Sequence, residues 1–192
     1  MSSENLNLIL KSRFGFDHFR EHQEEIIHHV LNGGHGLVIM PTGGGKSICY
    51  QLPALLRDGF ALVISPLISL MNDQVRSLRA NGIIAGALHS GTTGDESKTI
   101  HENIKNGSLK ILFISPERAL TPKFLDFLRD KTISLIAIDE AHCVSIWGND
   151  FRPEYAQLTT LIEIFNDVPV LALTATADKA TQEDIRQQLK LR

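Results

Sequence analysis

A glycine-rich turn between two apolar segments has the residue types that bind a nucleotide phosphate. The turn reads Met40-Pro41-Thr42-Gly43-Gly44-Gly45-Lys46-Ser47 and lies between the apolar segments 37–39 and 48–56. Glycines let the backbone curve around a phosphate, and the free N–H groups at a helix start point at the anion. Lys46 supplies a positive charge for the β- and γ-phosphates, and the Ser47 hydroxyl can bind Mg²⁺. The segment therefore predicts a strand, a phosphate-binding loop and a helix.

The loop departs from the general phosphate-loop pattern at one position. That pattern, G-x-x-x-x-G-K-[ST], asks for glycine where Met40 stands. A glycine-rich turn with an incidental lysine is therefore an alternative. A hydrolytic nucleotide site also needs acids that hold a metal and activate water, so the choice depends on the rest of the chain.

Such acids follow the apolar segment 135–138, which is typical of a buried strand. Asp139 comes next, at the mouth of that strand, where its carboxylate can hold Mg²⁺ opposite Ser47. Glu140 can orient and deprotonate the water that attacks the γ-phosphate. Two acids at a helix start are the alternative, because negative charge is favourable there. Together with the phosphate loop, the pair favours hydrolysis of a nucleoside triphosphate.

A small polar segment could couple this chemistry to a second ligand. Thr174-Ala175-Thr176 directly follows the apolar segment 168–173. It could relay nucleotide state from His142, which lies two residues beyond Glu140. Residues of this kind are also ordinary helix caps, and that alternative stays open.

The segment after the acids is rich in aromatic side chains. It holds the single tryptophan of the chain, Trp147, with Phe151, Arg152 and Tyr155 close by. Aromatic rings stack on unpaired bases, and an arginine can reach a phosphate or a base plane. A buried aromatic plug is the alternative, and composition alone does not separate the two.

Aromatic residues also lie near the N-terminus, together with an amide side chain. Phe14, Phe16 and Phe19 precede Gln23, which stands just inside an expected helix. A ring offers a face for a purine, and an amide can pair with the N6/N7 edge of adenine. Three phenylalanines near a helix are also common in a hydrophobic core.

Apolar segments of strand length alternate with helical patterns along the chain. This alternation predicts an α/β fold with an open, mainly parallel sheet, helices on both faces, and ligands outside the carboxyl ends of the strands. We expect strands at 37–39, 60–64, 83–88, 111–114, 135–138 and 168–173. We expect helices at 6–14, 20–31, 48–56, 67–81, 96–105, 123–128 and 179–189.

Composition indicates a single intracellular domain without a membrane span. The chain has 192 residues, 43% hydrophobic and 21% charged, and no apolar segment long enough to cross a bilayer. Cys49 and Cys143 have no zinc-ligand spacing, so we expect no structural zinc and no disulfide. A net charge of −3 argues against a broad basic surface that wraps nucleic acid, but not against a narrow groove.

Taken together, these motifs resemble those of superfamily 2 helicases, and specifically of the RecQ family. The likeness covers residues 8–190 and includes the Met40 that breaks the general loop pattern. It is carried by Phe14-Gly15-Phe16 with Arg20 and Gln23, and by the segments Met40–Ser47, Ser65–Gln74, Ser115-Pro116-Glu117-Arg118, Asp139-Glu140-Ala141-His142, Thr174-Ala175-Thr176 and Trp147–Tyr155.

The resemblance implies a three-layer RecA-like (P-loop NTPase) domain over 1–192, whose N-terminal helical region, about 4–32, carries the adenine motif. It implies a 3′-to-5′ DNA helicase that uses ATP and Mg²⁺ and acts on single-stranded or tailed duplex DNA in the cytoplasm, nucleoid or nucleus. Lys46 and Glu140 would be catalytic, and Ser47 and Asp139 would hold the metal. The resemblance implies that adenine is bound by Phe16, Arg20 and Gln23. It implies nucleic-acid contacts by Ser65, Pro66, Arg118, Trp147, Phe151 and Arg152. It implies that ATP hydrolysis is coupled to DNA by His142, Asn149, Thr174 and Thr176.

The chain departs from the family in three respects. Phe16 stands where a tyrosine is usual, and Asn149 stands where a histidine is usual. An asparagine does not titrate near neutral pH, so coupling at that residue is in question. These 192 residues do not include the second RecA-like domain that the resemblance implies, with the arginines that complete the ATP site. We therefore expect these 192 residues alone to bind nucleotide weakly, hydrolyse it very slowly and unwind nothing.

Other functions remain as alternatives. The chain could be a nucleotide-gated module that grips single-stranded nucleic acid without translocating. A P-loop kinase or GTPase is disfavoured by Asp139-Glu140 at a strand end, by Gln23 upstream of the loop, and by the lack of a guanine-reading N-K-x-D segment. RNA could replace DNA, since stacking and backbone contacts do not identify the sugar.

Overall fold

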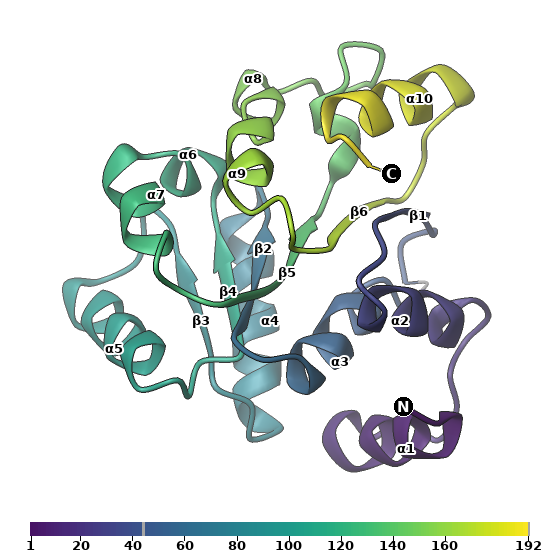
Figure 1. Ribbon diagram of the computed structural model, residues 1–192, viewed down its shortest axis with the longest axis vertical. Coiled ribbons are helices and arrows are strands. Elements are labelled where there is room, and N and C mark those ends of the chain that lie inside the picture. Colours follow the sequence, from purple (N-terminus) through teal and green to yellow (C-terminus); the bar gives the residue numbers. More distant parts are fainter. Residues whose placement is uncertain (44, 192) are drawn as a thin grey trace.

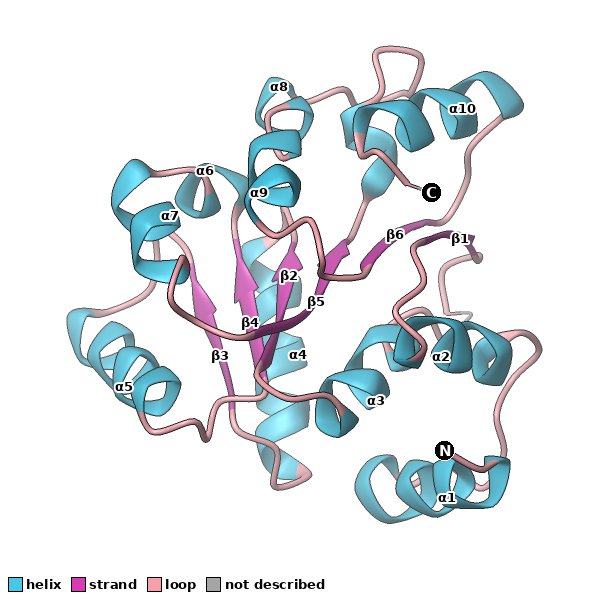
Figure 2. Ribbon diagram, viewed as in Figure 1, coloured by secondary structure: helices cyan, strands magenta, loops and turns pink. Residues whose placement is uncertain are grey.

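The computed structural model describes residues 1–43 and 45–191, so Gly44 of the phosphate loop and Arg192 lie outside the described residues. Within this part of the chain the strands form one six-stranded sheet in the order β1-β6-β5-β2-β4-β3, and every neighbouring pair is parallel (Figure 2). The strands are β1 Gly36–Ile39, β2 Phe60–Ile64, β3 Ala85–Leu88, β4 Ile111–Ile114, β5 Ile133–Ile138 and β6 Val170–Thr174.

Helices cover both faces of the sheet, because successive residues of the central strands point to opposite faces and are all apolar. In β2, Leu62 and Ile64 pack into one core, whereas Ala61 and Val63 pack into the other. The second core takes the buried sides of α2 (Gln23–Leu31), α3 (Ile48–Leu56) and α4 (Ile68–Ala80). The first takes those of α5 (Gly94–Lys105), α6 (Pro116–Ala119), α7 (Pro122–Leu128), α8 (Pro153–Ala156), α9 (Thr159–Ile164) and α10 (Lys179–Gln188) (Figure 1).

A third, smaller core attaches the N-terminal region to the domain. Leu6 of α1 (Ser3–Ile9) and Leu10 of the following π-helical turn pack on Ile27 of α2 and on Leu52 of α3. The turn ends at Gly15, which takes a left-handed backbone (φ 77°). The segment that carries Phe16, Arg20 and Gln23 is therefore held beside the helix that follows the phosphate loop.

The predicted α/β class with helices on both faces is confirmed, and each predicted strand is present with small shifts at its ends. The helix predicted at 20–31 begins later, at Gln23, because His22 has a left-handed backbone (φ 69°) that no helix accommodates. Short helices α6, α8 and α9 were not predicted; two of them are single turns whose four residues are too few for a periodic pattern.

The carboxyl ends of all the strands meet at one edge of the sheet. Register places Ile39 beside Thr174, and Ile64 beside both Ile138 and Ile114. The phosphate loop after β1 and the acids after β5 therefore lie on either side of the end of β6. Among the described residues, no helix is long and apolar enough to cross a membrane.

Candidate functional site

The phosphate loop is the turn between β1 and α3. Gly43 and Gly45 have left-handed backbones (φ 81° and 83°), which only glycine adopts without strain. Ser47 has a helical backbone and directly precedes α3. The Lys46 ammonium donates a hydrogen bond to the backbone oxygen of Met40, at 3.1 Å, so its charge is held over the loop itself.

The N-terminal segment is tied to this loop by two side chains. Buried Gln23 accepts a hydrogen bond from the Arg20 backbone N–H (2.7 Å) and donates one to the Gly45 backbone oxygen (3.0 Å). The Arg20 guanidinium donates to the Gly43 oxygen. A Cβ atom at Gly45 would lie 2.2 Å from the Gln23 amide nitrogen, so glycine is the residue that lets Gln23 approach.

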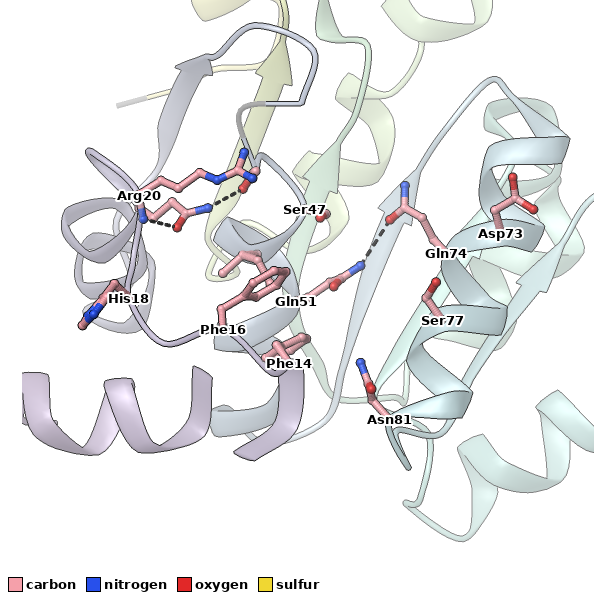
Figure 3. A pocket seen from close by; sticks show the side chains of 13 residues that line it. Phe14, Phe16, His18, Arg20, Ser47, Gln51, Asp73, Gln74, Ser77 and Asn81 are labelled. Carbon is pink, nitrogen blue, oxygen red and sulfur yellow. Dashed lines mark hydrogen bonds between the residues drawn. The ribbon is translucent and has the colours of Figure 1, made fainter. Parts of the chain in front are cut away.

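A hollow of about 440 Å³ lies next to this contact, within the size range of small-ligand pockets. Phe14 and Phe16 border one side, and Gln74, Ser77 and other polar side chains of α4 border the other (Figure 3). Phe16 is half exposed, so its ring is free to stack. Across the hollow, Gln51 of α3 donates a hydrogen bond to Gln74 (3.2 Å).

Asp139 lies at the end of β5 with only 8% of its surface exposed. Burial, together with the charge of Glu140, raises the pKa of this carboxyl to about 6. The nearby Lys46 ammonium lowers the pKa in part, which brings the loop lysine and the strand-end acid into one electrostatic site. Glu140 itself has a left-handed backbone (φ 53°), and its N–H donates to Asp139 Oδ1 (2.9 Å).

These groups fit a hard divalent cation. Two adjacent carboxylates at a buried strand end are costly without a compensating positive charge, as the raised pKa of Asp139 reflects. Oxygen donors of this kind are the ligands that Mg²⁺ takes in proteins. Asp139 and the Ser47 hydroxyl are the side chains that could hold such an ion.

His142 lies between the acids and β6. Its Nδ1 is 2.8 Å from Thr174 Oγ1 and 3.5 Å from a Glu140 carboxylate oxygen. Because the Thr174 hydroxyl donates to the Thr176 backbone oxygen (3.3 Å), it accepts from His142, which places a proton on Nδ1. The sequence reasoning expected a link between His142 and Thr174, and the structure brings the two side chains into contact.

Tyr155 supports the acids and was missed by sequence reasoning. It is fully buried in α8, and its hydroxyl donates to the backbone oxygen of Asp139 (3.0 Å). Its place within an aromatic segment suggested stacking on bases, whereas burial assigns it to positioning. A signal was present, since Pro153 favours the first position of a helix and so indicated that Tyr155 lies in a helical turn and not in an open loop.

The aromatic segment between η2 (Ala141–Val144) and α8 presents its rings to solvent. Trp147 is 67% exposed and Phe151 is 39% exposed. A buried plug is therefore the wrong interpretation for these two rings. The Arg152 backbone N–H donates to the Cys143 backbone oxygen (2.9 Å), and the Arg152 guanidinium pairs with Asp150 (3.2 Å). The segment therefore folds back toward the acids.

Asn149 borders a hollow of about 370 Å³ between this segment and the start of α10. His142, Trp147 and Thr176 line the same hollow. The fold thus brings together the coupling residues expected from the sequence.

A further hollow, of about 360 Å³, opens at the ends of β2 and β4. Pro66 and Arg118, two of the nucleic-acid residues implied by the resemblance, line it, whereas the Ser65 side chain is buried and accepts a hydrogen bond from the Leu67 N–H. Ser115, the first residue of the Ser115-Pro116-Glu117-Arg118 segment, also lines it, together with two hydroxyl residues that were not singled out from the sequence, Ser90 and Thr121. Ser90 follows the weakly patterned strand β3, and strand order alone places it at this edge.

Comparison with known proteins assigns the family. Residues 20–185, most of the chain, match the DEAD/DEAH box helicase family. The chain belongs to this family. It is 53% identical over 184 residues to the ATP-dependent DNA helicase RecQ of Haemophilus influenzae, and 51% identical over 183 residues to that of Pasteurella multocida. These alignments cover 96% and 95% of the chain but 30% and 29% of the relatives. The RecQ resemblance is confirmed, and the helicase domain spans about a third of its relatives' length.

Solved structures confirm the fold. The crystal structure of the helicase MrfA bound to DNA matches the whole chain with a TM-score of 0.77 at 21% identity, over 29% of that protein. The helicase domain of Hef from Pyrococcus furiosus matches 91% of the chain with a TM-score of 0.68, also at 21% identity, over 37% of that protein.

Proposed function

We propose that this chain is the N-terminal, Mg-ATP-binding motor domain of a 3′-to-5′ DNA helicase and that it contacts single-stranded DNA. The observation that carries the proposal is the convergence of the Lys46 loop and the Asp139-Glu140 pair on either side of β6, at the same sheet edge. The relatives from Haemophilus influenzae and Pasteurella multocida, both named ATP-dependent DNA helicase RecQ, support ATP and DNA as ligands.

The phosphate loop and the Asp139-Glu140 pair divide the chemistry of the proposed site between them. Backbone N–H groups of the loop and the start of α3 bind the phosphates, and Lys46 leaves the Met40 oxygen to reach the β- and γ-phosphates. Ser47 and Asp139 hold Mg²⁺, which supplies charge neutralisation at the phosphates when bound. Glu140 takes a proton from the attacking water.

Phe16, Arg20 and Gln23 would bind the adenine. The Gln23 amide and the Arg20 guanidinium bond to the loop in this structure, so base binding and loop conformation are linked through these side chains. If a bound nucleotide draws Arg20 or Gln23 to its base, the hydrogen bond from that side chain to the Gly43 or Gly45 backbone oxygen is lost.

Coupling to DNA would run through His142. A movement of the Glu140 carboxylate would shift the His142 imidazole, which contacts Thr174. His142 also lines one hollow with Trp147 and Asn149, so the same shift would be felt by the exposed aromatic segment. Trp147, Phe151 and Arg152 would stack on bases, and Ser65, Pro66 and Arg118 would follow the backbone. A second RecA-like domain is needed for fast turnover, since an arginine supplied to such sites is worth about 10³–10⁵ in rate.

ATPase assays with a tethered second RecA-like domain from a RecQ relative test this proposal. We expect hydrolysis to recover only when single-stranded DNA is present, and Lys46→Ala to abolish the recovery. Nucleotide and DNA binding without any recovery would contradict the motor function and favour a nucleotide-gated binding module. Competition between oligo-dT and oligo-rU reports which sugar is preferred.

Trp147→Ala should weaken binding of oligo-dT by about 1–3 kcal/mol, because stacking of one base on a ring has that value. Leu8→Ala is the matched control, since Leu8 is equally exposed (66%, against 67%) but lies in α1. Fluorescence polarisation of labelled oligo-dT measures the effect, and thermal unfolding checks stability. Unchanged affinity, or an equal loss with Leu8→Ala, would contradict stacking at Trp147.

A further inference from the structure

Three side chains of the kinds that bind zinc lie close together where the aromatic segment folds back toward Asp139 and Glu140. A ring nitrogen of His142, the Cys143 sulfur and a carboxylate oxygen of Asp150 all lie within 4.8 Å of one another. We propose that this cluster is a Zn²⁺ site. No short ligand spacing marks it in the sequence, because Asp150 is brought to Cys143 by the turn between them.

The distances require little rearrangement. Zinc bonds of about 2.0–2.3 Å in a tetrahedron place neighbouring ligand atoms about 3.3–3.8 Å apart. The Cys143 sulfur and Asp150 Oδ2 are already 3.9 Å apart. Asp150 is exposed, so its side chain can turn the remaining distance without disturbing the core.

The donor types select zinc over the magnesium of the nucleotide site. A thiolate and an imidazole favour Zn²⁺, whereas Mg²⁺ takes oxygen ligands. The Nδ1 hydrogen bond to Thr174 leaves the lone pair of His142 on Nε2 and fixes the ring, as partners of metal-bound histidines do. Asp150 is exposed, so solvent reaches the cluster and can supply a water as the fourth ligand.

Two features limit the affinity of the site. Burial raises the pKa of the Cys143 thiol to about 12, so zinc binding must release that proton to solvent, one for each ion bound. Asp150 also pairs with Arg152 (3.2 Å), and the ion competes with that guanidinium. The site is therefore suited to reversible occupation rather than to a permanent structural ion.

Zinc here would fasten the aromatic segment to the motif that carries Glu140. Trp147 and Asn149 lie between the ligands Cys143 and Asp150, so the ion closes a loop around them.

Absorption of Co²⁺-loaded protein, without nucleotide or DNA, tests the site directly. Co²⁺ replaces zinc, and only a bound thiolate gives a sulfur-to-cobalt charge-transfer band, so the other histidines of the chain contribute nothing to it. Parent protein titrated with Co²⁺ should show the band, saturating at one bound ion per chain, and should lose it on addition of Zn²⁺. Cys49→Ala is the matched control, because Cys49 is the other buried cysteine and lies in α3.

The expected result is a band that survives Cys49→Ala and disappears in Cys143→Ala. Asp150→Asn keeps the buried thiol intact and should weaken binding at least about tenfold, since even outer partners of a metal ligand are worth that much. Fluorescence of Trp147, the single tryptophan, should change with the same midpoint. A missing band in parent protein, or a band that survives Cys143→Ala, would overturn the proposal; normal Mg-ATP binding by the same sample would leave the proposed function intact.

Discussion

Glu140→Gln, in the chain tethered to a second RecA-like domain, is expected to bind Mg-ATP as tightly as the parent and to lose about 10²–10⁴ in turnover, the usual value of a general base. Glutamine keeps the size and the hydrogen-bonding capacity of the side chain but cannot accept the proton of the attacking water. Single-turnover hydrolysis and fluorescent-nucleotide binding measure the two quantities separately.

The structure allows this separation of binding from turnover. Glu140 is partly exposed and its carboxylate contacts His142, whereas Lys46 bonds to the Met40 oxygen, so replacement of Glu140 leaves that Lys46 contact in place. Glu102→Gln, on the exposed side of α5, is the matched control and should change neither quantity. Parent-like turnover in Glu140→Gln would remove the base assignment.

Asp139→Asn is expected to stabilise the nucleotide-free protein at pH 7.5 by up to about 3 kcal/mol, while it removes the magnesium dependence of ATP binding. The pKa of Asp139 is about 6 when folded, above the ordinary value near 3.9 of an unfolded chain. Folded protein therefore binds a proton that unfolded protein has released between about pH 4 and pH 6, and the free energy of unfolding falls as pH rises through this window.

Asparagine carries no charge at any pH, so the variant avoids the cost of an ionised buried carboxylate. The amide oxygen of the new side chain can still accept the Glu140 N–H, so the local turn is kept. Urea unfolding at pH 7.5 and pH 4.5 should show a stability gain at the higher pH that shrinks at the lower. An equal gain at both pH values would show that the charge of Asp139 is not what destabilises the parent.

Much of the fold could be predicted because the strands are buried on both faces. Continuous apolar segments such as 60–64 and 111–114 lie between polar turns, and this pattern is typical of the central strands of a parallel sheet. Strand order could not be read in the same way. The insertion of β6 between β1 and β5, which positions the loop opposite the acids, depends on packing over the whole sheet.

The phosphate loop and the acid pair were predictable because each directly follows an apolar strand segment in the sequence. Residues that act through contacts between distant parts of the chain were not predictable in this way. Tyr155 donates to the Asp139 oxygen, and Asp150 approaches Cys143, only because the segment between them turns back. The left-handed backbone of His22, which delays α2, lies next to Gln23, whose bonds to the loop and to Arg20 were equally invisible in the sequence.

Titration of ATP into the purified chain, with and without Mg²⁺, tests most directly whether the Lys46 loop and Asp139 bind one ligand together. We predict that Mg²⁺ tightens ATP binding in the parent, that Asp139→Asn binds ATP equally with and without Mg²⁺, and that Lys46→Ala weakens binding in both conditions. If the effect of Mg²⁺ were the same in Asp139→Asn as in the parent, the loop and the acid would not share the ion, and the proposed site would be wrong.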